Sequence, residues 1–509
     1  MKHMTIRDTL TLQNIRSRQQ MHRRQVRYFA LVWTGITLLV GAFTFAAVYT
    51  ATGVAARNGA GAGAGLQGLP PAGAEAPGAL VAQITATPFP TLAPTDTPEP
   101  PPPASPTPEP AVEPTQVLPP PPTPTVIPIL DTAFDLGIAI QKNPDPNVFA
   151  LWVDMAGSQL RLNWVKTQVV WRDMEQVRGQ IDFGELDVTM NALHQGNMRV
   201  LLSIVKAPDW ARDTGARIQP GVFDGPPANP QDYANFVAAV IQRYPGMIHA
   251  IEVWNEVNID REWTTNPPRI DARRYVDLLR VAYETIKAID PNIIVVTSGL
   301  SPTGANIPGA VTDDFIYMDQ MIEAGALQYA DCVGTHHNGL NVPPEAVWNN
   351  IPERNPPARF RGPWENPHHS WSFRSTLEGY AERIRRAGSS LQLCVTEFGW
   401  PSVEDLQNRG RLRDGFGFAA DNTLADQRDF TVRAIQLMQE WGFVRLAFIW
   451  NLNYGAQAGW MLSDPNTGQP APTGDNVPWS ILGPDFIPRP VWQAIVDMDF
   501  RGRPRSAAQ

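Results

Sequence analysis

The hydrophobic pattern between about Leu130 and Arg501 alternates between two periods. Short runs rich in β-branched and aromatic residues are each followed by a loop and by a stretch whose apolar residues recur every three or four positions. The short runs predict eight strands, over residues 134–140, 159–167, 198–205, 248–256, 293–299, 331–337, 391–398 and 445–453. The longer stretches predict amphipathic helices, among them residues 229–244, 271–290, 313–326, 375–388 and 425–441. Asp271 and Ser375 stand where N-caps are expected, and Gly388 stands where a helix would stop.

This regular alternation predicts a parallel sheet with right-handed crossovers. Eight such units in about 370 residues match a (β/α)₈ TIM barrel, an α/β fold. The alternative is an open doubly wound sheet, but no glycine-rich phosphate turn follows the first predicted strand. We therefore expect a TIM-barrel domain over residues 130–501, followed by a short tail over 502–509. In such a barrel the carboxyl ends of the strands meet at one mouth, where active sites lie.

Residues 28–50 have a different pattern, because they are almost wholly apolar and no charged residue occurs from Tyr28 to Ala56. A helix of ~20 apolar residues spans a bilayer, whereas the core of a signal peptide has only ~7–15. The basic segment 1–27 places the N-terminus in the cytoplasm and the rest of the chain outside. We expect a transmembrane signal anchor, with the barrel at the cell surface. Cleavage in the small residues near Ala56 would instead give a secreted protein.

Residues 51–129 are rich first in Gly and Ala and then in Pro and Thr. Such sequence cannot bury enough apolar surface to fold, and its prolines favour extended polyproline II. At ~3.1 Å per residue, the roughly forty Pro/Thr-rich residues would hold the next domain up to ~120 Å from the membrane. We predict a disordered linker. A docking tract for a proline-recognition module is the alternative.

The charge is uneven, since residues 1–27 carry +6 of a total of −9 and the remaining chain therefore carries −15. An acidic body argues against nucleic-acid binding, which depends on cationic patches. Nothing in the sequence points to a second subunit, so we expect a monomer.

The only cysteines are Cys332 and Cys394, which give neither a disulfide framework nor a zinc-binding spacing. Side chains alternate between the two faces of a strand, and His336 and Glu397 are expected to face the inside of the barrel. Counting from them predicts that Cys332 faces inward and Cys394 outward. We therefore predict that they do not form a disulfide. We expect no cofactor and no metal.

Two predicted strands end in glutamate, in Trp254-Asn255-Glu256 and in Thr396-Glu397-Phe398. Two carboxylates across a barrel mouth suit glycoside hydrolysis, in which one is the acid/base and the other the nucleophile. A separation of ~5–5.5 Å indicates retention of configuration and ~6.5–9.5 Å inversion. For either glutamate alone, a salt bridge to a nearby Lys or Arg is the alternative.

Glu252, two alternations deeper than Glu256 along the same predicted strand, is expected to have a structural charge partner, either Lys166 or Arg161. Glu256 is expected at the open mouth, where an apolar setting would raise its pKa toward neutrality, as a general acid needs.

VWNEVN (253–258) and VTEFGW (395–400) resemble the motifs of the clan A glycoside hydrolases, which are retaining (β/α)₈ enzymes, and families 39 and 5 in particular. The residues 164–183, APDWA (207–211) and DCVGTHHNG (331–339) also resemble segments of that clan. The resemblance covers the barrel and neither the anchor nor the linker. It implies that Glu256 is the acid/base, that Glu397 is the nucleophile and that Asn255 binds the sugar 2-hydroxyl.

The resemblance also implies that His336 orients a catalytic carboxylate or binds sugar, with a structural core histidine as the alternative. Trp210 and Trp450 would stack on sugar rings, although either could instead pack at the barrel rim. In two positions the chain departs from the clan. Lys166 stands at the end of the second predicted strand where the clan has Arg, and Asn338 stands where it has Tyr. A metal pair of His336 and His337 is disfavoured, because adjacent strand residues face opposite sides.

A long loop, residues 340–373, follows the sixth predicted strand and carries several aromatic and imidazole side chains: Trp348, Trp364, Trp371, His368 and His369. We interpret it either as a wall or lid of the cleft, or as an inert insertion packed by its own tryptophans.

Together these features predict a retaining glycoside hydrolase that cleaves O-glycosidic bonds of a polysaccharide or glycoconjugate. The alternative is a non-catalytic carbohydrate-binding or cell-envelope structural protein on a degenerate barrel. A metal-dependent barrel hydrolase lacks a convincing ligand set.

Overall fold

A computed structural model describes residues 134–213, 224–352, 368–413, 415–464, 468–469, 471 and 474–498. The predicted cytoplasmic segment, the anchor over residues 28–50, the linker and the tail 502–509 lie outside the described residues. Within the described part of the chain, no helix is both long enough and apolar enough to cross a bilayer.

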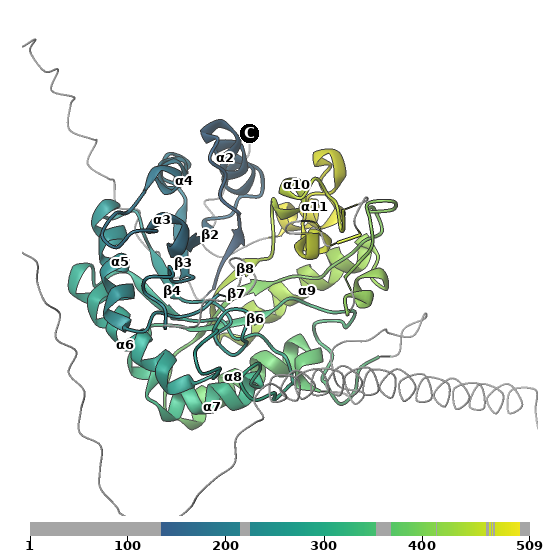
Figure 1. Cartoon of the computed structure of the whole chain (residues 1–509). Helices are drawn as coiled ribbons and strands as arrows, with labels where there is room; N and C mark the ends of the chain where they lie inside the picture. The colour runs from purple at the N-terminus through teal and green to yellow at the C-terminus, as the bar shows by residue number, and fades with distance from the viewer. Residues whose placement is uncertain are drawn as a thin grey trace, which may run out of the picture. The chain divides into compact units, whose positions relative to one another are not determined.

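Eight parallel strands form the centre of the fold (Figure 1). They are β1 (Asp135–Ala139), β2 (Trp164–Val170), β3 (Arg199–Val205), β4 (Ala250–Val253), β5 (Ile294–Thr297), β6 (Val333–His337), β7 (Leu393–Phe398) and β8 (Val444–Ile449). The ladder runs in the order β5-β4-β3-β2-β1-β8-β7-β6, and parallel bridges from Val296 to Cys332 and from Leu300 to Thr335 join its two ends. The predicted (β/α)₈ barrel is confirmed.

Helices lie around the strands, as Figure 1 shows. They are α2 (Pro146–Asp154), α3 (Trp171–Met174), α4 (Gly184–Gln195), α5 (Pro230–Arg243), α6 (Ala272–Ile289), α7 (Asp314–Glu323), α8 (Phe373–Arg386), α9 (Leu424–Trp441), α10 (Tyr454–Gln457) and α11 (Pro490–Asp497). The predicted cap Asp271 accepts hydrogen bonds from the first backbone amides of α6, and Gly388 follows α8 with φ 75°. The cap predicted at Ser375 is wrong. The hydroxyl of Ser372 accepts the backbone N–H of Ser375, so α8 begins at Phe373.

The second strand starts later than predicted. Residues Met155–Gln159 continue the preceding helix α2 as a π-helical turn, and the chain becomes extended only at Trp164. Lys166 therefore lies inside β2 and not at its end. Arg161 is exposed in the intervening turn, with φ 57°.

The two apolar regions that hold the strands in place lie on opposite faces of the barrel wall. One lies between the outward faces of the strands and the helices. The other fills the inside of the barrel and consists of Trp164, Leu201, Ala250, Ile294, Val296, Cys332, Cys394, Leu446 and Phe448. Gly137 is required beside this inner layer, because a Cβ there would lie 2.7 Å from the Phe448 ring.

The prediction that Cys332 and Cys394 do not bridge is wrong. Both side chains belong to the inner layer and form a disulfide, with their Cα atoms 5.8 Å apart. The reason is a register shift, since Thr335 of β6 pairs with Val395 but the next residue, His336, pairs with Glu397. A β-bulge of this kind adds one residue to a strand and breaks its alternation. Counting back from Glu397 by twos therefore assigned Cys394 to the wrong face.

The disulfide spans 62 residues of sequence. We expect the double variant C332A/C394A to lose about 2–4 kcal/mol of unfolding free energy, because the unfolded chain regains the entropy that the cross-link removes. Guanidinium unfolding with and without a reductant measures this. The reductant should destabilise the wild type and leave the variant unchanged. Equal stability of the oxidised and reduced wild type would contradict the expectation.

Candidate functional site

The chain leaves strand geometry before it reaches Glu256, so the fourth strand is shorter than predicted. β4 ends at Val253, and Trp254 and Glu256 have φ angles of 75° and 42°. Non-glycine residues in this left-handed region cost of order 1–3 kcal/mol and persist only where their surroundings hold them. Here the Trp254 indole donates to the Glu262 carbonyl, and the Glu256 backbone N–H donates to the Gly299 carbonyl. The turn directs the Glu256 carboxylate into the barrel mouth, where only 7% of the residue is exposed.

Glu252 is fully buried and is held by charge. Lys166 Nζ lies 3.0 Å from Glu252 Oε2, so Lys166 is the predicted partner and Arg161 is not. The Thr396 hydroxyl also donates to Glu252, over 2.7 Å. Burial raises the pKa of Glu252, but the charge of Lys166 and the hydrogen bonds lower it by more, so the pKa lies well below its usual range.

Lys166 also contacts the second candidate carboxylate. Its Nζ lies 3.2 Å from Glu397 Oε1, at the end of β7. The other oxygen of Glu397 accepts a hydrogen bond of 3.0 Å from the Asn338 amide. The two positions at which the chain departs from the clan A pattern, Lys166 and Asn338, are thus the two side chains that hold Glu397.

His336 connects the carboxylates. Its Nδ1 lies 3.2 Å from Glu256 Oε1 and 3.8 Å from Glu397 Oε2, and its Nε2 lies 3.7 Å from Glu252. Gly299 leaves room for the ring, since a Cβ there would lie 2.3 Å from His336 Cδ2. Burial lowers the pKa of His336, but the surrounding carboxylates, Glu397 foremost, raise it to about 9. The ring is therefore protonated at neutral pH and attracts all three carboxylates.

The separation of the two candidate catalytic carboxylates is bounded by this histidine. Because 3.2 Å and 3.8 Å separate one nitrogen from the two oxygens, Glu256 Oε1 and Glu397 Oε2 are at most the sum of these distances apart, about 7 Å. This upper bound on one pair of oxygens is compatible with the ~5–5.5 Å between carboxyl groups that is typical of retaining glycosidases.

Arg261, which the sequence did not single out, is the second partner of Glu256. Its Nη2 donates to Glu256 Oε2 over 2.9 Å, and 57% of its side chain is exposed. Burial raises the pKa of Glu256, but the hydrogen bond to His336 and the charge of Arg261 outweigh it and hold the pKa below its usual range. The predicted rise toward neutrality is therefore wrong for this arrangement. The expectation assumed an apolar setting, whereas two cations face the carboxylate.

A cavity of about 250 Å³ opens beside this network. Of the predicted site residues, Glu256, His336, Asn338 and Trp450 line it. The described residues Lys166, Asn255, Glu397 and Trp210 do not. The Asn255 Oδ1 atom is buried and has no hydrogen-bond partner among the described residues. The peptide bond that follows Trp450 is cis.

Trp210 packs in the wall of the barrel. Its indole donates to the Glu175 carbonyl, its ring meets the edge of Trp171, and the Arg178 guanidinium lies 4.5 Å from the centre of the ring. For Trp210 the alternative to sugar stacking, packing at the barrel rim, is therefore the correct one. Aromatic side chains from loops after β7 and β8 line the cavity instead, namely Phe416, Phe418 and Trp479. These three residues could not be recognised in the sequence, because they do not stand at strand ends and only the paths of the loops bring them to the mouth.

Both ends of the loop 340–373 reach the cavity, through Leu340 and Ser370. Trp371 is buried, whereas Trp348 is 43% exposed. Trp364 lies outside the described residues. The described ends of the loop thus form part of the cavity wall.

No family model and no curated protein matches the chain. Solved structures that are similar to it include a family 39 glycoside hydrolase from the gut symbiont Bacteroides cellulosilyticus WH2, with 18% identity and a TM-score of 0.46 over 73% of this chain and 64% of that one. The family 39 enzyme from Xanthomonas axonopodis pv. citri has 18% identity and a TM-score of 0.44 over 72% and 66%. A family 39 β-xylosidase from Caulobacter crescentus has 17% identity and a TM-score of 0.46 over 73% and 72%. The chain spans less than two thirds of the first two. Its function is therefore inferred from the side chains of the site.

Proposed function

We propose that the barrel is a retaining glycosidase in which Glu397 is the nucleophile and Glu256 the acid/base. The observation that carries this proposal is a pair of carboxylates whose facing oxygens are at most about 7 Å apart and contact one protonated histidine beside a cavity. In the first step Glu397 attacks the anomeric carbon while Glu256 protonates the leaving oxygen. In the second step Glu256 removes a proton from water, and the water releases the sugar from Glu397.

The environment of Glu397 suits a nucleophile. Lys166 and Asn338 each contact one of its oxygens, at 3.2 Å and 3.0 Å, and so restrict the rotation of the carboxylate. A fixed near-attack orientation lowers the entropic part of the barrier. Lysine keeps the positive charge that the clan obtains from Arg but makes a point contact in place of a planar fork.

The environment of Glu256 requires a change during the reaction, because a general acid must carry a proton and its present partners favour the ionised form. Arg261 is the partner that can leave, since more than half of its side chain is in solvent. A sugar in the cavity would displace Arg261 and exclude water, and both effects raise the pKa of Glu256.

For the substrate we propose a polysaccharide or glycoconjugate. Trp450 and Trp479 provide flat aromatic faces in the cavity, which suit the C–H surfaces of pyranose rings. Asp475 and Asn476 provide polar groups for hydroxyls.

We propose that the barrel works outside the cytoplasm, tethered by residues 28–50, with secretion after cleavage as the alternative. The disulfide between Cys332 and Cys394 supports this location, because disulfides persist mainly in oxidising compartments. Protease added to intact cells should remove the barrel from the cell surface. Full protection in intact cells, with digestion after lysis, would contradict the proposal.

The variant E397A tests the nucleophile. We expect it to lose hydrolysis of activated aryl glycosides by about 10⁴-fold or more, because no other group can form the glycosyl-enzyme. Added azide should restore turnover with inverted product, since azide fits the space of the lost carboxylate. E284A, which removes an exposed carboxylate from α6, is the matched control and should behave as wild type. Wild-type activity in E397A would overturn the assignment. A wild type that binds glycans and hydrolyses none would support the non-catalytic alternative.

The variant R261Q tests the acid/base. Removing the cation raises the pKa of Glu256, and a general acid loses its proton as the pH rises through its pKa. We therefore expect the alkaline limb of the kcat/KM profile to move to higher pH for an aryl glycoside with a poor leaving group. R280Q, on the exposed face of α6, is the control and should leave the profile in place. An unchanged or lowered alkaline limb in R261Q would show that Arg261 does not govern the acid.

A further inference from the structure

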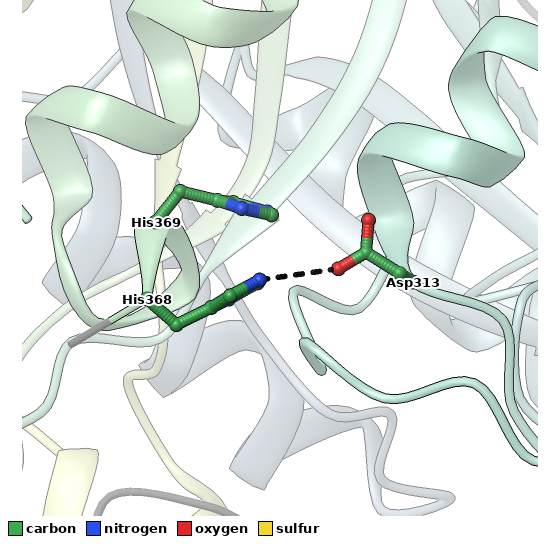
Figure 2. Close-up of side chains that lie close together, drawn as sticks. All are labelled: Asp313, His368 and His369. Atoms are coloured by element: carbon green, nitrogen blue, oxygen red, sulfur yellow. Dashed lines mark ion pairs between the residues drawn. The ribbon is translucent and has the colours of Figure 1, made fainter. Parts of the chain in front are cut away.

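Two imidazoles and a carboxylate converge where α7 begins and the long loop returns to the barrel (Figure 2). Asp313 precedes α7, while His368 and His369 precede α8. One ligand atom of each side chain lies within 4.8 Å of the others. None of the three side chains belongs to the network of carboxylates described above.

The spacing between Asp313 and His368 fits a shared ion better than a hydrogen bond. His368 Nε2 lies 3.6 Å from Asp313 Oδ2, which is too long for a hydrogen bond. Two ligands of one tetrahedral zinc ion, each ~2.0–2.2 Å from the metal, lie about 3.4 Å apart. The gap therefore needs little adjustment to hold an ion.

Asp313 is partly engaged, in a way that leaves one oxygen for a metal. Its Oδ1 caps α7 by accepting the backbone N–H groups of Phe315 and Ile316, at 3.0 Å and 3.2 Å. Its Oδ2 faces His368. Only 6% of the residue is exposed, and the two cap hydrogen bonds fix the direction of the carboxylate before any ion arrives.

His368 has a neighbour that can set its tautomer. The Ser370 hydroxyl lies 3.0 Å from His368 Nδ1 and can accept a hydrogen bond from an Nδ1–H, the tautomer in which the Nε2 lone pair faces Asp313. The Ser370 backbone N–H donates to the same nitrogen over 3.3 Å and favours the opposite tautomer, so a metal at Nε2 would require the Nδ1 proton to bond to the hydroxyl.

His369 is held rigidly. Its ring stacks on Phe315 at 3.5 Å with an interplanar angle of 3°, and its Nε2 lies 3.0 Å from Asp314 Oδ1. Asp314 is itself buried and accepts a hydrogen bond of 2.6 Å from Tyr380. A buried carboxylate beside the imidazole is how proteins usually orient metal-binding histidines. The centres of the two imidazole rings lie 4.1 Å apart, and a cation shared between the rings would also be attracted to the Asp313 carboxylate.

We propose that Asp313, His368 and His369 bind one zinc-class divalent cation, with water in the remaining position. Two imidazole nitrogens and one carboxylate oxygen are ligands that suit Zn²⁺ and its neighbours Ni²⁺ and Cu²⁺. The ion would join the return of the long loop to the start of α7. Ser370, which follows directly, lines the cavity, so the ion would also hold part of the cavity wall. This proposal does not depend on the glycosidase assignment.

The test is a titration of the metal-depleted full chain with Zn²⁺ alone, read by calorimetry and by competition with a chromophoric chelator. The wild type should bind one ion with a sharp end point, and its thermal midpoint should rise with zinc. D313N is the decisive variant, because Asn caps helices as well as Asp does but lacks the charged oxygen. We expect D313N and H368Q each to weaken binding by at least about 100-fold, beyond the 10–100-fold cost of losing an outer-shell partner.

The matched control is H194Q, which removes a partly exposed histidine of α4 and should bind zinc as the wild type does. Circular dichroism and the zinc-free thermal midpoint establish that D313N is folded. Absence of saturable binding in the wild type would overturn the proposal. So would unchanged affinity in both D313N and H368Q, or loss of the same site in H194Q.

Discussion

The site depends on one buried ammonium group shared between two carboxylates. Lys166 is 1% exposed and lies within hydrogen-bond distance of Glu252 and Glu397, which come from different strands. Burying a charge is tolerable only where partners of opposite sign replace water. His336 and Arg261 contact a third carboxylate, that of Glu256. The site therefore holds three cationic side chains and three carboxylates. Removing one partner of such a network typically costs about 3–5 kcal/mol, because the others keep an uncompensated charge.

The two candidate catalytic carboxylates are held in physically different ways. Glu397 is held by Lys166, which has no access to solvent and cannot move without breaking its contact with Glu252. Glu256 is held partly by Arg261, whose side chain is largely in solvent. A nucleophile benefits from a fixed geometry, whereas an acid/base must change its protonation state within one cycle. The arrangement thus combines one permanent and one removable cation.

The positions of the strands and of five helices, α5 to α9, could be predicted because periodicity reports burial directly, and the barrel follows from eight alternations. A cationic partner for Glu252, either Lys166 or Arg161, could also be predicted because a buried carboxylate requires a cation nearby, and the structure shows that it is Lys166. The failures share a cause. One extra residue in β7 reversed the predicted face of Cys394, and two residues with positive φ ended β4 before Glu256. Local irregularities of this size leave no periodic signal in a single sequence.

The sequence by itself determined the strand-and-helix order, the acidic body and the two glutamates at or just beyond a strand end, because these depend on residues adjacent along the chain. Only the tertiary structure decided that Arg261 lowers the pKa of Glu256 and that aromatic residues from the loops after β7 and β8 line the cavity. It also decided that Asp313 lies beside two histidines more than fifty positions away. These contacts join loops whose paths depend on packing against the whole barrel, and no local pattern encodes such a path.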